Sequence, residues 1–356
     1  MLAQERALPS GSAVVSCPAP YGAGGLGRHA QEIVEALERR EQPASYLSEE
    51  NRRAAARTSG PRAALARATV GTLIRPFPAW RISRRSARFD SYAARNLPRA
   101  DQLICFNGTA LAQLEAAHGL GFASSSLMSG NSHMRRVIRQ HDLAYRRYPL
   151  ERPWPTQLLA RNLREYERAD RIHVASRYVW ESFTEEGLAE EKLSYFPLTP
   201  DPRYEPHALP VASSTFDVLY IGSLLVHKGV PLLIDAFRRL PHADMRLILV
   251  GGWKTRGMRR FIEKACAEDA RIRVEPGDPL PHLRRARLCV HPAYEEGFGY
   301  APAEALACGV PVIVSQDTGM KELLALGGNG LILPTGEVNA LTDAIDAAYR
   351  REILRG

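Results

Sequence analysis

The sequence predicts an α/β protein of two domains, each built on a parallel β-sheet. Its 356 residues are too many for a domain with one ordinary hydrophobic core and are about right for two domains. Hydrophobic residues make up 45% and charged residues 24%, which is a globular composition. Short apolar runs alternate with amphipathic helical patterns, and this alternation is typical of parallel sheets covered by helices on both faces.

The alternation is clearest in the C-terminal half, where each apolar run is short, rich in Val, Ile and Leu, and bounded by Gly, Pro or polar residues. The predicted strands are Phe216–Ser223, Met245–Gly252, Arg271–Gly277, Ala286–Ala293, Val310–Gln316 and Gly330–Pro334. The predicted helices are Pro231–Leu240, Arg256–Glu268, Pro302–Cys308, Lys321–Leu326 and Asn339–Leu354.

The N-terminal half follows the same pattern around a basic region at residues 51–100, which is predicted to be helical and irregular. Its predicted strands are Ala13–Cys17, Gln102–Phe106, Ala123–Met128 and Arg171–Ala175, and its predicted helices are Leu26–Arg39, Leu111–His118 and Pro155–Glu167. Five prolines between Phe196 and Pro210 prevent regular pairing and indicate a hinge near residues 197–213. We therefore expect domains at residues 1–200 and 201–356.

Cysteine usage and hydropathy predict a cytoplasmic protein. No apolar run approaches the roughly 18–20 residues of a membrane-spanning helix, and the N-terminus lacks the pattern of a signal peptide. The five cysteines are scattered, without metal-ligand spacing, and suit reduced core thiols.

The net charge of +8 is concentrated in the first half of the chain. Residues 51–100 contain twelve Arg and a single acidic residue, Asp90, interspersed with large apolar residues. This mixture favours peripheral contact with an anionic membrane surface, on its inner face, or a phosphorylated substrate. A solvated Arg-rich surface is the alternative. No recognised nucleic-acid motif accompanies the charge, so a nucleic-acid partner is not expected.

The segment His291–Val314, HPAYEEGFGYAPAEALACGVPVIV, contains the most informative motif. A strand ends here, Gly297 and Gly299 form a turn, and Pro302 opens a helix at a position where a missing N–H costs nothing. The carboxyl end of a parallel strand is where open α/β sheets bind ligands. Free N–H groups there favour an anion, while a carboxylate accepts hydrogen bonds from sugar hydroxyls.

The pair Glu296 and Glu304, eight residues apart within this segment, resembles the signature of glycosyltransferase family 4, the group 1 glycosyl transferases with the GT-B fold. The resemblance implies two Rossmann-like domains facing a cleft. It implies that Glu296 contacts hydroxyls of the donor sugar and Glu304 the ribose of the nucleotide. It also implies that the backbone of Gly297, Phe298 and Gly299 lies against the sugar and phosphates.

A second motif, YIGSLLVHKGVPLLIDAF at Tyr220–Phe237, places Lys228 just before a predicted helix. A cation there can neutralise a leaving diphosphate. Members of the family typically have an Arg five residues before this Lys. Here that position is Ser223, which can donate a hydrogen bond but carries no charge.

The third motif follows the first strand, where Gly22, Gly24 and Gly27 satisfy the dinucleotide fingerprint, with Glu49 about twenty residues further on. An NAD site is therefore one interpretation, and a merely tight turn another. The family carries a similar turn, and the resemblance implies that Gly25 and its neighbours let the backbone approach the donor.

The fourth motif, SGNSHMRRVIRQH at Ser129–His141, places His133 in a polar turn after a predicted strand. The resemblance implies that this His faces the reaction centre from the acceptor side. An exposed or capping histidine is the alternative. Ser176 is a weaker match, to a serine at a strand end.

Together these matches imply a retaining glycosyltransferase, in polysaccharide or glycoconjugate biosynthesis, that moves a sugar from a nucleoside diphosphate sugar to a hydroxyl acceptor, either a sugar, a lipid-linked sugar or a small molecule. With no Asp-x-Asp at a strand end and no His/Cys cluster, we expect neither a metal nor a cofactor beyond the donor itself. The open alternatives are a non-catalytic GT-B scaffold subunit, an NAD-dependent oxidoreductase and a sugar-nucleotide epimerase.

Overall fold

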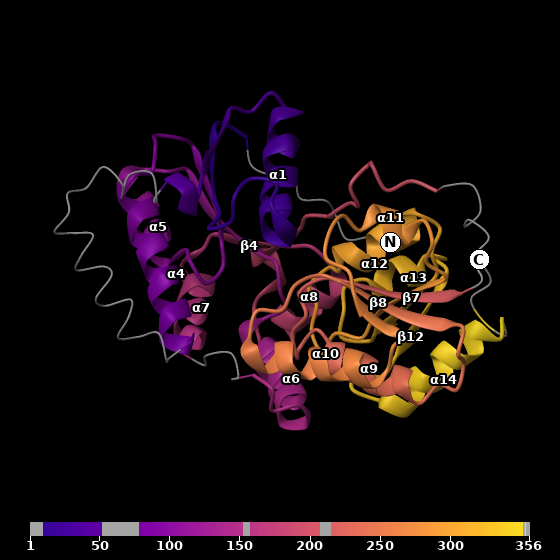
Figure 1. Ribbon diagram of the computed structural model, residues 1–356. Coiled ribbons are helices and arrows are strands. Elements are labelled where there is room, and N and C mark those ends of the chain that lie inside the picture. Colours follow the sequence, from indigo (N-terminus) through magenta and orange to yellow (C-terminus); the bar gives the residue numbers. More distant parts are fainter. Residues whose placement is uncertain (1–9, 52–77, 152–156, 207–214, 352, 354–356) are drawn as a thin grey trace. The chain divides into compact units, whose positions relative to one another are not determined.

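The computed structural model describes residues 10–51, 78–151, 157–206, 215–351 and 353. The chain forms two compact units (Figure 1), each around a parallel sheet, as predicted. Each sheet has six strands. Unit 1 comprises Met1–Arg135, Trp154–Ala175 and Val179–Leu198, and unit 2 comprises Arg136–Pro153, Ser176–Tyr178 and Thr199–Gly356. Unit 2 thus takes two segments from before residue 200. Just over half of the basic region, residues 52–77, and the last part of the predicted hinge, residues 207–213, lie outside the described residues.

The sheet of unit 1 has the order β2-β1-β3-β4-β5-β6, with every pair of neighbours parallel. Its strands are β1 (Ala13–Ser16), β2 (Ala44–Leu47), β3 (Gln102–Phe106), β4 (Ser124–Ser129), β5 (Arg171–Val174) and β6 (Leu193–Tyr195). Helix α1 (Gly24–Glu38) buries Ile33 and Leu37 in a core that also contains Val15 and Phe106. The spacing of these apolar positions is that of one face of a helix.

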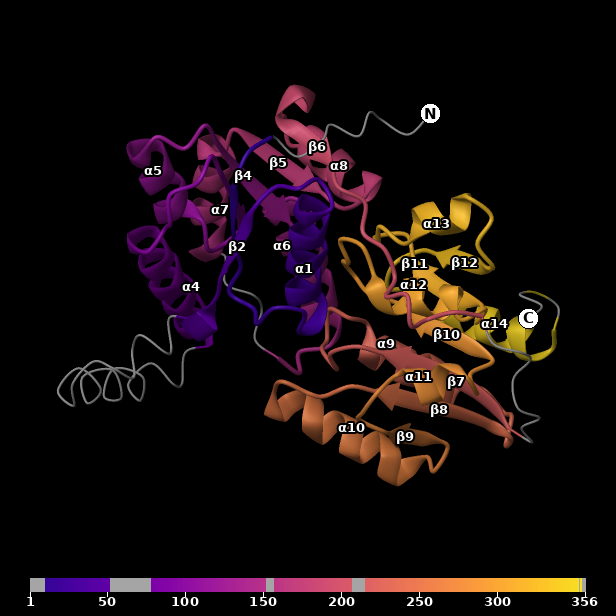
Figure 2. The ribbon, with the colours of Figure 1, turned by 90° about the horizontal axis from the view of Figure 1, so that it is seen from above.

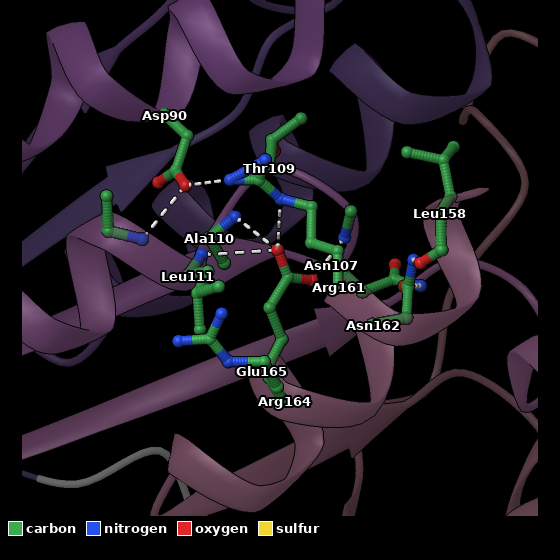
Figure 3. A network of polar contacts seen from close by, with 12 residues as sticks. Asp90, Asn107, Thr109, Ala110, Leu111, Leu158, Arg161, Asn162, Arg164 and Glu165 are labelled. Carbon is green, nitrogen blue, oxygen red and sulfur yellow. Dashed lines mark hydrogen bonds and ion pairs between the residues drawn. The ribbon is translucent and has the colours of Figure 1, made fainter. Parts of the chain in front are cut away.

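Three other helices of unit 1, α4 (Pro78–Arg95), α5 (Leu111–Leu120) and α7 (Gln157–Arg168), pack against one another (Figure 1). Helix α5 begins without a side-chain cap from its own N-cap residue, Ala110. Carboxylates from the other two helices take that role (Figure 3). Glu165 of α7 accepts from the N–H groups of Gly108, at 2.5 Å, and Ala110, at 2.8 Å.

Asp90 of α4 completes this cap, accepting from the backbone N–H groups of Ala112 at 2.9 Å and Gln113 at 3.1 Å. Arg161 forms ion pairs with both Asp90 and Glu165, whose side chains are fully buried (Figure 3). Orphan N–H groups of a helix start attract negative charge, so the two carboxylates join three helices at one point.

Replacing Glu165 with Gln should lower the free energy of unfolding of unit 1 by about 2–3 kcal/mol, since buried donors lose a charged acceptor. The matched control is Glu115→Gln, which affects a 44% exposed side chain whose ion pair with Arg164 also joins α5 to α7. That change should cost less than about 1 kcal/mol. Chemical denaturation of both variants measures the difference, and equal losses would contradict the capping role.

The sheet of unit 2 has the order β12-β11-β10-β7-β8-β9 and is also parallel throughout (Figure 2). Its strands are β7 (Phe216–Ile221), β8 (Met245–Val250), β9 (Ile272–Val274), β10 (Leu288–His291), β11 (Val312–Ser315) and β12 (Gly330–Leu333). Its helices are α9 (Val230–Arg238), α10 (Arg256–Glu268), α11 (Leu280–Leu283), α12 (Tyr300–Ala307), α13 (Lys321–Ala325) and α14 (Val338–Tyr349). Every predicted strand and helix of this half is present.

Besides a 3₁₀ turn at Glu190–Lys192, two strands and two α-helices among the described residues before residue 200 were not predicted. They are β2, β6, α6 (Met134–Arg147) and α8 (Arg177–Thr184). The two strands are short, at four and three residues. Helix α6 contains five Arg, so its sequence looks polar although one of its faces is apolar. That face includes Val137, Ala144 and Tyr145. Ala144 and Tyr145 lie in the hydrophobic core of unit 2.

All five cysteines are free, and four of them are buried. Among the described residues, no helix is both long and apolar enough to cross a membrane.

Candidate active site in the C-terminal unit

The winding of unit 2 reverses between β7 and β10, which lie side by side in its sheet. Strands β8 and β9 continue on one side of β7, and β11 and β12 on the other side of β10. The loops that leave the carboxyl ends of β7 and β10 therefore diverge. Such a switch point is where open α/β sheets bind ligands.

The loop after β7 carries Lys228 immediately before α9. Gly229 follows it with a φ of +74°, and a Cβ on this glycine would lie 1.9 Å from the carbonyl oxygen of Pro292. Only glycine fits this backbone and this spacing. The close approach holds the start of α9 against the segment that follows β10.

The loop after β10 fixes Glu296 through both of its backbone groups. The Glu296 N–H donates to the carbonyl of Asp317 at 3.1 Å, and the Glu296 carbonyl accepts from the Gly319 N–H at 3.0 Å. Both partners belong to the loop after β11. A Cβ on Gly319 would lie 2.2 Å from the carbonyl oxygen of Gly297, so these two loops pack with no room for a side chain. The position of Glu296 is thus set by backbone contacts.

The side chains of Lys228 and Glu296 meet at this switch point. Lys228 Nζ lies 2.7 Å from Glu296 Oε2, and His291 Nε2, at the end of β10, lies 3.3 Å from the same oxygen. The Lys228 and Glu296 side chains are 18% and 21% exposed. Among the described residues, none forms a hydrogen bond with Glu296 Oε1. One oxygen is therefore anchored, and the other is available to a substrate.

The pair is ionised on both sides. Burial alone would raise the pKa of Glu296, but the charge of Lys228 and the hydrogen bond from His291 hold it well below its usual range. Burial alone would lower the pKa of Lys228, but the carboxylates of Glu296 and Glu295 outweigh it and raise that pKa. A fixed positive charge and a fixed carboxylate therefore stand side by side at neutral pH.

The Gly-rich turn and helix α12 follow Glu296 directly. Gly299 is the N-cap of α12 with a φ of +95°, and Phe298 is 8% exposed. The carbonyl of Gly297 accepts from the hydroxyl of Ser176 at 2.6 Å, so this serine supports the loop. Glu304 is buried in α12, and its charge raises the pKa of the buried Tyr204, an effect second to that of burial.

Ser223 lies in the loop that follows β7, at the position where members of the family typically have an arginine. Its carbonyl accepts from the hydroxyl of Tyr220 at 3.0 Å. Tyr220 in turn stacks on His291, with ring centroids 5.7 Å apart and planes 5° apart. Ser223 therefore belongs to the same loop as Lys228, and its side chain adds no positive charge there.

The other two predicted site residues, Gly25 and His133, lie in unit 1. Gly25 is exposed in the first turn of α1. The turn before it is tight, because a Cβ on Gly27 would lie 2.1 Å from the carbonyl oxygen of Pro20. The contacts of these two residues with a substrate stay predictions.

His133 is 5% exposed and packs between Tyr166 and Phe183, at centroid distances of 5.0 and 5.2 Å. Its Nδ1 accepts from the N–H of Arg135 at 3.3 Å, in the first turn of α6. The ring therefore caps α6, which matches the capping alternative. This hydrogen bond gives His133 a structural role in which no substrate takes part.

His291 and Tyr204 are neighbours of the site that sequence reasoning missed. The signal for His291 was its place as a polar residue at the end of a buried strand, LCVH. Tyr204 gave no signal, since it lies among the prolines that indicated a hinge. Among the described residues, no group of three or more His, Cys, Asp or Glu side chains could hold a metal ion.

Residues 205–355 match the family model described as glycosyl transferases group 1. O-antigen chain mannosyltransferase B from Escherichia coli is 35% identical over 132 residues, which are 35% of this chain and 34% of that protein. D-inositol 3-phosphate glycosyltransferase from Pseudarthrobacter chlorophenolicus is 30% identical over 150 residues, 39% of this chain and 36% of that protein. The matched part spans about a third of the length of these curated relatives.

Solved structures resemble nearly the whole chain. Sucrose-phosphate synthase from Thermosynechococcus elongatus has a TM-score of 0.68 at 18% identity, covering 95% of this chain and 90% of that one. HepE from Anabaena, solved in complex with UDP and glucose, has a TM-score of 0.65 at 16% identity, covering 96% and 90%. At such identities the likeness shows the fold, which is GT-B. Residues 205–355 therefore resemble the glycosyl transferases group 1 family, in a chain that has the GT-B fold.

Proposed function

We propose that the protein transfers a sugar from a nucleoside diphosphate sugar to a hydroxyl group of an acceptor. The observation that carries this proposal is the Lys228–Glu296 ion pair at the switch point of unit 2, where Glu296 keeps one oxygen for a substrate. A cation beside a hydroxyl-binding carboxylate suits a ligand that carries both phosphate and sugar.

The catalytic demand of such a transfer is mainly electrostatic. As the glycosidic bond to phosphate breaks, through an oxocarbenium-like state, negative charge grows on the departing diphosphate. Lys228 supplies the opposite charge. The first turns of α9 and α12 begin at Gly229 and Gly299, and neither has a side-chain cap. Their N–H groups add a field of the same sign.

Glu296 is proposed to hold the sugar. Lys228 and His291 anchor Oε2, so Oε1 accepts from a hydroxyl of the donor sugar in a fixed direction. Glu304 is proposed to accept from the ribose, with Tyr204 beside it. In this arrangement the chain's own lysine, rather than a metal, meets the diphosphate. Retention of the anomeric configuration is proposed from the family resemblance.

The relatives support the substrate class. HepE was solved with UDP and glucose, and the curated relatives are named as a mannosyltransferase of an O-antigen chain and a glycosyltransferase of D-inositol 3-phosphate. We therefore propose an acceptor with a hydroxyl group in polysaccharide or glycoconjugate synthesis. Contact with an anionic membrane stays a prediction, because just over half of the basic region lies outside the described residues.

A thermal-shift comparison of the full chain with UDP, GDP, ADP and NAD, without added metal, tests the donor class. A diphosphate at about 100 times its Kd should add about 2.7 kcal/mol to the free energy of unfolding and raise Tm by several degrees. Stabilisation by NAD alone would overturn the proposal in favour of an oxidoreductase.

Turnover then separates the remaining alternatives. Incubation with the matching nucleotide sugar and saccharide acceptors should release the nucleoside diphosphate. Binding of the donor with no transfer to any acceptor would indicate a scaffold subunit. Conversion of the nucleotide sugar without an acceptor would indicate an epimerase.

A further inference from the structure

We propose that Tyr145 and His227 act as a positioning pair that holds Lys228 in place for the departing diphosphate. This inference rests on the proposed function and adds to it two residues that do not touch the substrate. The hydroxyl of Tyr145 lies 3.1 Å from His227 Nδ1, and His227 directly precedes Lys228 in the loop after β7. The pair thus connects helix α6 to the residue that carries the charge.

His227 lies where three parts of unit 2 meet. Its carbonyl accepts from the N–H of Tyr294 at 2.8 Å, in the loop that carries Glu296. Its ring stacks on that of His141 of α6, with centroids 4.1 Å apart and planes 23° apart. The ring is 6% exposed, so it has little freedom to move away from these partners. One residue therefore fixes both loops of the site with respect to α6.

Helix α6 is firmly attached to the rest of unit 2 through the residues that directly follow it. The hydroxyl of Tyr148 donates to Asp235 of α9 at 2.7 Å. Just after α6, Glu151 accepts from the N–H of Val226 at 2.8 Å and from the hydroxyl of Thr255 at 2.7 Å. A rigid helix can transmit its position through a hydrogen bond, so Tyr145 holds His227 against a fixed reference.

The position of Lys228 needs such support because a lysine side chain has four rotatable bonds and a compact point charge. The ammonium group is held only at the tip of the side chain, by Glu296 Oε2 at 2.7 Å and the carbonyl of Glu295 at 3.5 Å. The backbone on the far side of Lys228 is fixed by Gly229 against Pro292. Tyr145 and His227 provide the equivalent constraint on the near side.

The histidine is also uncharged, which suits a support for a cation. Burial above all, and then His141 and Lys228, hold the pKa of His227 well below its usual range, although Glu296 acts in the opposite direction. Burial and then Lys228 lower the pKa of His141 to about 3. At neutral pH the two rings therefore pack beside Lys228 without repelling its charge.

The test compares Tyr145→Phe with Tyr148→Phe in the full chain. Both changes remove one hydroxyl from a buried tyrosine, in α6 for Tyr145 and directly after it for Tyr148, and both break a hydrogen bond within unit 2. We expect Tyr145→Phe to lower kcat about fivefold to tenfold, with the donor KM changed less than about twofold, because the diphosphate needs Lys228 most in the transition state. Tyr148→Phe should leave both constants at their wild-type values, because the two hydrogen bonds of Glu151 still attach α6. Equal kcat values for the two variants would overturn the proposal.

Two changes at His227 give a second readout. His227→Asn keeps a polar group where Nδ1 lies, so it should retain most of the wild-type kcat. His227→Leu can neither accept nor donate a hydrogen bond, so its kcat should be as low as that of Tyr145→Phe. The double variant Tyr145→Phe, His227→Leu should be no slower than either single variant, because both remove the same contact. Additive losses would show that the residues act separately. Nucleotide binding by the wild type, measured in parallel, keeps a failure of this pair distinct from a failure of the proposed function.

Discussion

Replacing Glu296 with Gln is expected to lower kcat by about 10²–10³-fold, the loss typical of one fixed electrostatic contact in an active site. Glutamine keeps the size of the side chain but not the charge that accepts strongly from a sugar hydroxyl. It also removes the counter-charge of Lys228, whose side chain is only 18% exposed. Steady-state assays well below Tm, with circular dichroism to confirm folding, measure the effect on catalysis alone.

The informative comparison is Glu304→Ala in the same motif. Glu304 is proposed to contact the ribose, so this variant should raise the Kd for the nucleoside diphosphate more than it lowers kcat. Unchanged kinetics in both glutamate variants would remove the assignment of the site. A loss of binding alone in both would place Glu296 with the nucleotide rather than with the sugar.

Replacing Lys228 with Met is expected to lower both turnover and stability. Turnover should fall by about 10²–10³-fold, because no charge remains to meet the diphosphate. The free energy of unfolding of unit 2 should fall by about 2–3 kcal/mol, since a largely buried carboxylate loses its partner. Denaturant titration of the full chain, followed through the unfolding of unit 2, measures this loss of stability.

The stability loss of Lys228→Met should depend on pH with a definite sign. In the wild type the pKa of Glu296 lies below the unfolded value of 4.5, so its contribution is present above about pH 4.5 and lost as pH falls through the folded pKa. Without Lys228, burial raises this pKa, and the carboxyl can protonate to escape its penalty. The difference in stability between wild type and variant should therefore narrow as pH falls, above pH 4.5 because the variant's carboxyl protonates in the folded state, and below it because the wild type loses the contribution of its ionised Glu296. A gap that is constant with pH would mean that Lys228 stabilises the fold by packing.

The double variant Glu296→Gln, Lys228→Met separates stability from catalysis. It removes both charges, so it should be more stable than either single variant, while its turnover stays as low. Recovery of activity together with stability would show that the pair supports only the fold.

The second sheet was predictable because its central strands are buried on both faces and read as continuous apolar runs. Strand β7 was predicted at Phe216–Ser223 and is observed at Phe216–Ile221, and α10 matches at both ends. Thr255 marks that helix start, since its side chain accepts from the Met258 N–H. Helix α6 was missed because its arginines suggested a polar segment, whereas its apolar face fits a core formed by distant residues.

The site was predictable as a set of residues but not as a geometry. The motifs placed Glu296 and Lys228 at two strand ends, and spacing within each motif does not reveal that they form an ion pair. That contact follows from the order of the strands, which brings β7 next to β10. Tyr145 and His227 are 82 positions apart, and no local pattern connects them.

The path of the chain through the two units limits where two homologous sequences can be joined into one chimeric chain. Ala144, Tyr145 and Tyr148 precede residue 199 yet lie in the core of unit 2. A fragment that begins at residue 199 would lack these side chains and Glu151, and would expose the apolar surface they cover. Exchange of N-terminal halves between homologues at a single junction near residue 200 would pair a foreign α6 with this core. In a functional chimera, residues 136–153 therefore have to come from the same protein as the C-terminal unit, although they lie within the N-terminal half of the sequence.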